Sequence, residues 1–160
     1  MRILGIDPGL QVCGYAVVDV DGYAEKLIEA GVLRIDTDRE LEKRLNQIAD
    51  DIGVLLETFA PDVLAIEELY SHYAHPKTAI LMGHARGVIL QKAGAAGLTV
   101  KHFAATRIKK SLTGNGRASK GQMQRSIQTV LGLSEAPEPN DVADAIAAAL
   151  CCANTIGKLI

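Results

Sequence analysis

Four acidic residues of this 160-residue chain stand where folding can bring their side chains to one place. Asp7 and Glu67 each end a short apolar run, while Asp141 and Asp144 follow a proline-rich turn. Carboxylates held close together repel one another and need a cation between them. Ligand sets made only of oxygen suit a hard ion such as Mg²⁺ or Mn²⁺, and such ions, used in pairs, cut phosphodiesters. The four residues therefore predict a divalent-metal site with nuclease chemistry.

Each acid also has an ordinary structural interpretation. Asp7 lies in an Ile-Asp-Pro-Gly stretch that suits a tight turn. Asp141 and Asp144 stand three apart, which places both on one face in the first turn of a predicted helix, but acids there also suit the helix dipole. Of Glu67 and Glu68, only one can share the face of Asp7, because side chains alternate along a strand. We choose Glu67 and expect Glu68 to face elsewhere or to form a surface pair.

Basic residues are segregated in the middle of the chain. No Asp or Glu occurs between Glu68 and Glu135, and that interval holds ten of the seventeen cations and all four histidines. The ten are Lys77, Arg86, Lys92, Lys101, Arg107, Lys109, Lys110, Arg117, Lys120 and Arg125. The net charge of −2 alone argues against a polyanionic partner, whereas this distribution favours one. The alternative is that these residues cover ordinary solvated faces.

The elements that must position the acids begin with strands. Residues 2–7 read as a short buried strand, and strands at 13–20 and within 25–35 follow, with a hairpin signal at Asp21-Gly22. This pattern predicts an antiparallel meander that carries Asp7 on its first strand.

A helix and a fourth strand come next. Residues 38–59 carry one apolar stripe at helical spacing, Pro61 stops it, and 63–66 form a short apolar strand. The stripe consists of Leu41, Leu45, Ile48, Ile52, Leu55 and Phe59. A strand–helix–strand crossover would set the fourth strand parallel to the first. Asp7 and Glu67 would then lie side by side at one edge of the sheet.

The remainder of the chain reads as helices with one more strand. We expect helices over 77–96, 106–113, after a Ser119 cap, and over 141–155 with Asn140 as its cap, and a strand over 98–103. Gly83 and Gly87 form a small-residue face that serves either packing within the chain or a subunit contact. The order predicts an α/β fold in a single domain, residues 1–160, with a five-stranded mixed sheet (three antiparallel strands, then two parallel) flanked by helices.

Composition places the chain among globular proteins, since 48% of its residues are hydrophobic and 22% are charged. No apolar run approaches the length of a membrane span, and Met1 leads directly into a strand rather than a signal peptide. Cys13, Cys151 and Cys152 are few and odd in number, so we expect buried free thiols. These features predict a cytoplasmic protein without a membrane partner.

Five motifs occur together in a characteristic order. They are Gly5-Ile6-Asp7-Pro8-Gly9, Ala65-Ile66-Glu67-Glu68, Gly83-His84-Ala85-Arg86-Gly87, Thr113-Gly114-Asn115-Gly116-Arg117-Ala118-Ser119-Lys120 and Asp141-Val142-Ala143-Asp144-Ala145. Each motif alone is weak, but as a group they cover almost the whole chain and are highly specific. On these motifs the chain resembles the RuvC family of bacterial Holliday junction resolvases.

The resemblance implies a ribonuclease H-like fold, a homodimer, and Mg²⁺-dependent paired nicking of four-way DNA junctions, with RuvA and RuvB as partners. It implies that Asp7, Glu67, Asp141 and Asp144 are catalytic and hold two Mg²⁺ ions, with Mn²⁺ as an alternative. Lys109, Arg117 and Lys120 would contact DNA, as would Tyr70 or Tyr73. The segment 70–77 is about one residue longer than the family form, so which tyrosine stacks on the junction stays open.

Two other functional classes remain as rivals. An ATP-dependent enzyme of the actin and sugar-kinase type also starts with an Asp on its first strand, but the chain lacks glycine-rich phosphate loops and has about half the length of such a protein. A non-catalytic DNA-binding module is the second rival. The carboxylates argue against it, because idle acids would repel phosphate.

Overall fold

The computed structural model describes residues 1–69 and 76–157. Its strands are β1 (Arg2–Asp7), β2 (Val12–Asp21), β3 (Ala24–Arg34), β4 (Val63–Glu67) and β5 (Thr99–Phe103). They form one sheet in the order β3-β2-β1-β4-β5. β2 is antiparallel to both of its neighbours, whereas β1, β4 and β5 run parallel to one another. The predicted mixed sheet is confirmed.

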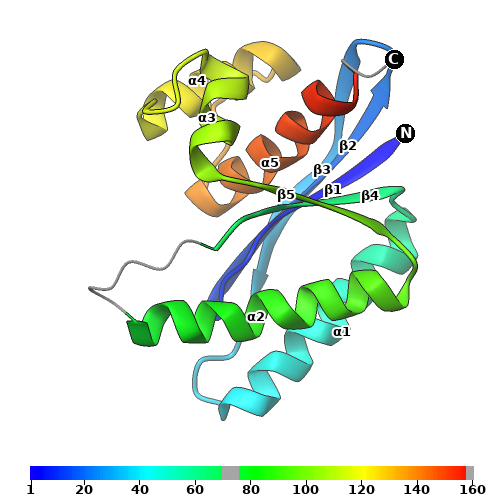
Figure 1. The fold of residues 1–160 in the computed structure, drawn as a ribbon, viewed down its shortest axis with the longest axis vertical. Helices are drawn as coiled ribbons and strands as arrows, with labels where there is room; N and C mark the ends of the chain where they lie inside the picture. Colours follow the sequence, from blue (N-terminus) through cyan, green and yellow to red (C-terminus); the bar gives the residue numbers. More distant parts are fainter. Residues whose placement is uncertain (70–75, 158–160) are drawn as a thin grey trace.

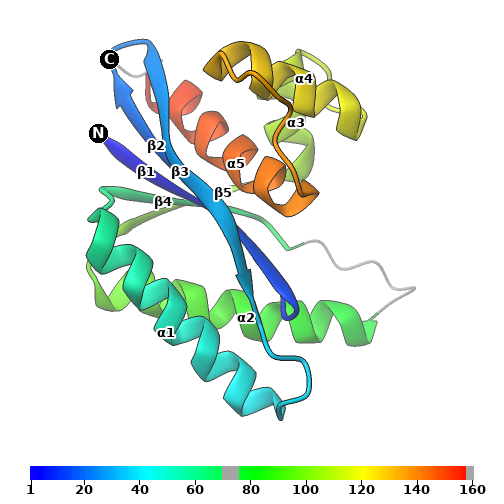
Figure 2. The same ribbon diagram turned by 180° about the vertical axis from the view of Figure 1, so that it is seen from behind.

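Helices cover both faces of this sheet. The helices α1 (Leu41–Phe59) and α2 (Pro76–Ala95) lie on one face. On the other face lie α3 (Ala105–Thr113), α4 (Lys120–Leu131) and α5 (Asn140–Ile156) (Figure 1). The reverse view shows α5 crossing the long β2–β3 hairpin (Figure 2). A separate hydrophobic core fills each side, so the central strands β1 and β4 are buried on both faces, as their continuous apolar runs predict.

The Ala-rich helix α5 lies unusually close to the sheet. A Cβ atom on Gly5 would stand 2.2 Å from the carbonyl oxygen of Ala145, and one on Gly14 would stand 2.0 Å from that of Asp141. Both distances are shorter than any real contact, so only glycine permits this packing. Glycines in β1 and β2 thus bring the start of α5 against the strands.

The helix α1 begins at Leu41, three residues later than the predicted start at Asp38. The Asp36 side chain accepts a hydrogen bond from the Asp38 backbone N–H at 3.1 Å, and its carbonyl accepts one from Arg39 N–H at 3.4 Å. Arg39 and Asp36 also form an ion pair at 3.0 Å. This local turn competes with the helix for the same backbone groups, which explains the later start.

The helix α5 departs from prediction at its first turn. Asn140 is already helical and Pro139 is the N-cap, with no side-chain capping bond, so the assignment of Asn140 as the cap was wrong. Pro139 has φ −69° and ψ 179°, an extended conformation that suits an N-cap position. Asp141 lies in the first turn, whereas Asp144 falls in the second. Both stay three residues apart on the helix.

Other local predictions are confirmed. Ser119 caps α4 in a reciprocal capping box with Gln122, with hydrogen bonds of 3.3 and 2.8 Å. Cys13, Cys151 and Cys152 are buried free thiols. Within residues 1–69 and 76–157, no helix combines the length and the apolarity that crossing a membrane requires.

Candidate active site

Asp7 and Glu67 lie at neighbouring strand ends, as predicted. β1 and β4 are parallel and in register, with Ile6 opposite Ile66, so the next residue of each strand is acidic. Both acids are partly buried. The sheet therefore presents two carboxylates at one edge.

The start of α5 brings the remaining acids to the same edge. Asp7 pairs with Gly14 on β2, and Gly14 in turn lies under the backbone of Asp141. Asp144 follows one turn later and shares a hollow with Asp7 and Glu67. Acids from three distant segments of the chain thus converge.

The pKa values register this convergence. The pKa of Asp7 is raised to about 7, mainly by burial and then by the nearby charges of Asp144, Asp141 and Glu67, while Lys120 lowers it. Burial is also the main cause that raises the pKa values of Glu67 and Asp144. Because each raised value means that the charged form is disfavoured, added positive charge would stabilise the ionised site.

One side of the carboxylates opens into a basic pocket between α3, α4 and α5. Its accessible volume is about 190 Å³. Its lining residues are Glu67, Ala105, Ile108, Lys109, Lys120, Met123, Gln124, Asn140, Ala143, Asp144 and Ala147. Lys109 enters this pocket from α3, and Lys120 enters it from α4. The two lysines predicted to contact DNA therefore lie beside the acids.

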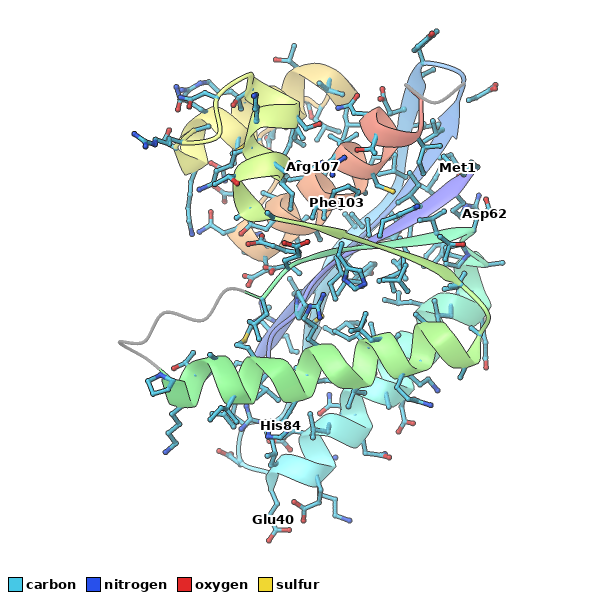
Figure 3. The ribbon with its side chains drawn as sticks, viewed as in Figure 1. Met1, Glu40, Asp62, His84, Phe103 and Arg107 are labelled. Carbon is cyan, nitrogen blue, oxygen red and sulfur yellow. The ribbon has the colours of Figure 1, made fainter. Side chains whose placement is uncertain are left out.

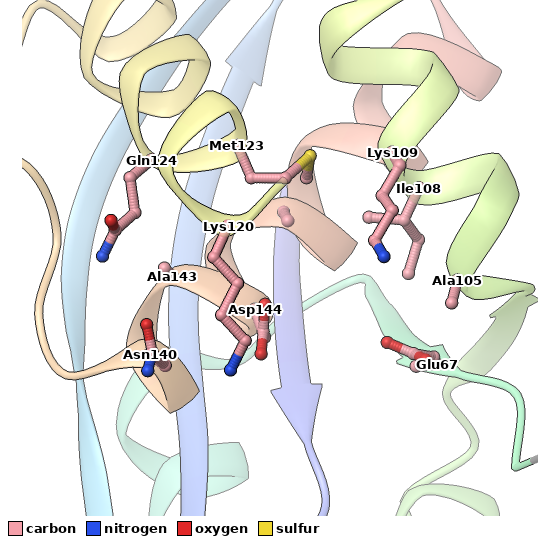
Figure 4. A pocket seen from close by; sticks show the side chains of 11 residues that line it. Glu67, Ala105, Ile108, Lys109, Lys120, Met123, Gln124, Asn140, Ala143 and Asp144 are labelled. Carbon is pink, nitrogen blue, oxygen red and sulfur yellow. The ribbon is translucent and has the colours of Figure 1, made fainter. Parts of the chain in front are cut away.

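Packing at the β5–α3 junction sets the position of Lys109. Arg107 stacks over the Phe103 ring at 5.2 Å from its centroid (Figure 3). Ile108 is buried on the same helix, and Lys109 follows on the pocket side. Lys120 is instead the first residue of α4, next to the Ser119 cap. Figure 4 shows the Lys120 side chain extending toward Asp144, while Lys109 reaches down from α3 on the side of Glu67.

The other side of the carboxylates opens into a second hollow, of about 310 Å³. Its lining residues are Asp7, Pro8, Glu67, Glu68, Leu69, Met82, Arg86 and Asp144. The expectation that Glu68 faces elsewhere was wrong, since Glu68 lines the same hollow as Asp7. β4 ends at Glu67, so the strict alternation of strand side chains no longer applies one residue later.

The donor set fits a hard divalent cation. All four candidate ligands are carboxylates, which supply the oxygen atoms that Mg²⁺ and Mn²⁺ prefer. Within the described residues, no three His, Cys, Asp or Glu side chains form a ready-made metal cage. The raised pKa values of Asp7, Glu67 and Asp144 are consistent with acids that face one space and repel one another.

The sequence did not single out several residues that support this site. Arg86 donates a hydrogen bond from Nε to the Glu67 carbonyl at 3.2 Å. Arg44 donates from Nη2 to the Leu10 carbonyl and so ties α1 to the loop after Asp7. Both bonds join segments far apart in the chain, and only the position of Arg86 in the Gly-His-Ala-Arg-Gly motif could have signalled it.

Of the other three predicted DNA contacts, only Arg117 lies within the described residues. Tyr70 and Tyr73 fall outside the described residues. Arg117 is exposed in the loop between α3 and α4, where its backbone N–H donates to Asn115 Oδ1 at 2.9 Å. Arg117 is not among the residues that line either hollow beside the acids.

Comparison with known proteins agrees with this geometry. The family model described as crossover junction endodeoxyribonuclease RuvC matches residues 3–152. A crossover junction endodeoxyribonuclease RuvC of Rhodopirellula baltica is 50% identical over 149 residues, which are 93% of this chain and 84% of the relative.

Solved structures agree at the level of the fold. A Thermus thermophilus RuvC structure has a TM-score of 0.89 and 32% identity, covering 98% of this chain and 95% of that one. A structure of T. thermophilus RuvC in complex with Holliday junction substrate has a TM-score of 0.88 and 29% identity, with the same coverage. The strand order, the clustered acids and these matches lead to one assignment: the chain belongs to the RuvC family of crossover junction endodeoxyribonucleases.

Proposed function

We propose that the protein resolves four-way (Holliday) DNA junctions in homologous recombination and DNA repair, by paired symmetric nicks in opposed strands. The observation that carries this proposal is the convergence of Asp7, Glu67 and Asp144 beside a pocket lined by Lys109 and Lys120. Acids that share a space suit cations, and lysines beside them suit the phosphates of a strand crossing the site. The family membership supports the same reaction.

Asp7, Glu67, Asp141 and Asp144 would hold two Mg²⁺ ions, with Mn²⁺ able to replace them. When bound, the ions would activate water for attack on phosphorus and stabilise charge on the leaving 3′ oxygen. Asp7 lies centrally in this set, since its pKa responds to all three other acids. It must lose its proton before it can act as a ligand, and the positive charge of nearby Lys120 favours that loss.

The two lysines would position the DNA strand. Lys109 and Lys120 enter from different helices, so together they can hold phosphates on either side of the scissile bond (Figure 4). Lys120 lies near enough to Asp144 and Asp7 to lower both of their pKa values, so it can also offset charge that develops on the scissile phosphate. Arg117 would add a peripheral phosphate contact, and Tyr70 or Tyr73 would stack on the junction.

A homodimer would supply the pair of cuts. A four-way junction is close to two-fold symmetric, so two equal sites related by a two-fold axis can nick opposed strands. α2 is our candidate for the interface, because Ile80 is 62% exposed on it. Gly83 and Gly87 also line an open groove between α2 and α1. Sedimentation of the wild type and of Ile80→Glu tests this, with a dimer expected only for the wild type.

Cellular context follows from family resemblance. We propose that the protein acts in the cytoplasm together with RuvA and RuvB, the partners that the family resemblance implies. The nuclease activity itself can be tested without them.

The decisive test is incubation with a synthetic four-way junction and Mg²⁺, with nicks mapped on all four strands. We expect symmetric nicks on two opposed strands, none in EDTA, and none on a linear duplex of the same sequence. Junction binding without any nick in Mg²⁺ or Mn²⁺ would instead favour the non-catalytic binding module.

A further inference from the structure

Arg86 is the only cation among the described residues that line the hollow on the α2 side of the acids. Glu67, Glu68, Asp7 and Asp144 share that hollow. Even so, the ion pairs of the described part of the chain do not include Arg86. Its guanidinium is committed to other partners, which indicates a role other than neutralising a carboxylate.

Those partners are a backbone carbonyl and an imidazole. Arg86 Nε donates to the carbonyl oxygen of Glu67 at 3.2 Å, and Arg86 Nη2 lies 2.6 Å from His102 Nδ1. An arginine is always protonated, so Nδ1 of His102 must be the acceptor in this contact. Arg86 therefore joins the end of β4 to β5 from the helix above them.

The peptide group after Glu67 is held on both sides. Its carbonyl accepts from Arg86, and its N–H, that of Glu68, donates to the Phe103 carbonyl at 2.9 Å. The pairing of β4 with β1 ends one residue earlier, at Ile66. On the β5 side Glu67 still pairs with Phe103, so the carbonyl side of this peptide is the one that strand pairing leaves unsupported. A tilt of the peptide on that side would redirect the Glu67 side chain. The Arg86 contact prevents it.

A purely electrostatic role is the alternative, and the charges argue against it. Burial chiefly raises the pKa of Glu67, Asp144 raises it further, and Lys109 lowers it. Arg86 is not among these causes, although it contacts the Glu67 backbone. Its effect on Glu67 is thus one of geometry.

We propose that Arg86 is a positioning residue for the metal ligand Glu67: it fixes the last peptide of β4, and His102 holds Arg86 in place. The proposal rests on the proposed function, because it gives Glu67 a metal to bind. Groups that orient a metal ligand without touching the metal contribute roughly 10- to 100-fold to metal affinity or activity.

The test compares Arg86→Met with Lys92→Met, which removes another half-buried cation from the same helix. For Arg86→Met we expect faster hydrogen exchange at the Glu68 amide and roughly 10-fold weaker Mn²⁺ binding by calorimetry without DNA. The kcat for nicking should fall roughly 10- to 100-fold, with the junction Kd in Ca²⁺ unchanged within about 2-fold. Lys92→Met should leave all four quantities near those of the wild type.

Two further variants separate geometry from charge and from misfolding. Arg86→Lys keeps the charge but cannot bond both partners, so we expect it to resemble Arg86→Met. His102→Leu removes the acceptor for Arg86 and should cause a smaller loss of Mn²⁺ affinity than Arg86→Met does. In His102→Gln the amide oxygen can accept the same bond, so Mn²⁺ affinity should return toward that of the wild type. The His102 pair keeps the proposal testable if Arg86→Met does not fold.

Several results would overturn the proposal. They are full activity of Arg86→Lys, unchanged exchange at Glu68 in folded Arg86→Met, or a junction Kd that weakens in parallel with kcat. The last result would show that Arg86 contacts DNA. A wild-type protein that binds Mn²⁺ but never nicks a junction would refute the proposed function. Hydrogen exchange at Glu68 and Mn²⁺ binding would still test whether Arg86 positions Glu67.

Discussion

The two ends of the central strands treat acidic residues in opposite ways. Near Met1 and Asp62 (Figure 3), Arg2 binds Asp19 through two hydrogen bonds of 2.7 and 2.9 Å. The Arg2 backbone N–H also donates to Asp62 Oδ2 at 2.6 Å. The bond from Arg2 lowers the pKa of Asp19. At the opposite end of β1, burial and neighbouring acids raise the pKa of Asp7 to about 7.

At one end of the strands the acid is paired with a cation of the protein itself. At the other end the acids lie close together and can bind a cation from solution. Asp19 has its cation on the adjacent strand, whereas Asp7 lies among three acids, each of which affects its pKa more strongly than Lys120 does. Clustered like charges destabilise a fold, so they persist where function needs them. The contrast can be tested by making the same substitution at each end of the strands, at Asp7 and at Asp19, and comparing the effects.

The largest expected effect is on nicking by Asp7→Asn. We expect junction cleavage in Mg²⁺ to fall more than about 1000-fold with junction binding retained, because a neutral amide cannot replace a carboxylate as a ligand of divalent ions. Asp19→Asn, at the satisfied end, should cleave within about 2-fold of the wild type. Strand-specific nick assays measure both. Cleavage retained by Asp7→Asn would remove Asp7 from the metal site.

The next effect concerns DNA affinity at the lysine-lined pocket. The double variant Lys109→Gln/Lys120→Gln should weaken junction binding roughly 10-fold or more and flatten its salt dependence, by ~0.9 in slope for each phosphate that is no longer neutralised. Lys26→Gln/Lys43→Gln removes two exposed lysines from β3 and α1 and serves as the control. Equilibrium binding in Ca²⁺ over a salt series measures the slope. Equal slopes for the two double variants would mean that the binding face is misplaced.

A third prediction tests how the sheet positions α5. Gly5→Ala introduces a Cβ that collides with the Ala145 carbonyl, so the helix and its two acids must shift. We expect a loss of about 1–3 kcal/mol in the free energy of unfolding and a further loss of nicking. Gly94→Ala, on α2, meets open space and should be neutral or slightly stabilising. Urea unfolding compares the two, and a Gly5→Ala variant as stable as the wild type would refute the close packing.

The last prediction concerns the pH dependence of stability without metal, which acts on folding alone. The pKa of Asp7 is raised in the folded protein, so its protonated carboxyl stabilises the fold at pH values below the unfolded pKa of 3.8. This contribution to stability is lost as the pH rises through about 7. Asp7→Asn should therefore be more stable than the wild type by roughly 1–3 kcal/mol at pH 8 in EDTA and nearly equal to it below pH 4.

Asp19→Asn should show the opposite sign. The pKa of Asp19 is lowered, so its contribution is present above the unfolded value and is lost as pH falls. The variant should be less stable than the wild type at neutral pH only. Urea unfolding from pH 3 to pH 8 measures both differences, and the same sign for the two variants would contradict the contrast between the strand ends.

The sequence predicted most of the fold because local and global signals agree. Apolar runs marked β1 and β4, and the strand–helix–strand order placed Asp7 beside Glu67. The start of α1 was missed because a side chain two residues away, that of Asp36, competes for the backbone. The N-cap of α5 was missed by one residue, since the extended Pro139 takes that position and Asn140 is already helical.

What the sequence did not predict depends on contacts across the fold. The closeness of α5 to the sheet requires both Gly5 and Gly14, each opposite a helix carbonyl. Arg86 reaches Glu67 from a helix 19 residues further along the chain. Glu68 joins the site because β4 ends one residue before it. Such pairings are properties of the assembled structure, and no short motif encodes them.

The most direct test of the account is the position of Mn²⁺ ions, located by anomalous scattering in crystals of the protein grown with that metal. We predict two ions bounded by Asp7, Glu67 and the Asp141–Asp144 turn of α5. Ions found only elsewhere, such as beside Asp19 and Asp62, or no ion at Asp7 at saturating Mn²⁺, would contradict it.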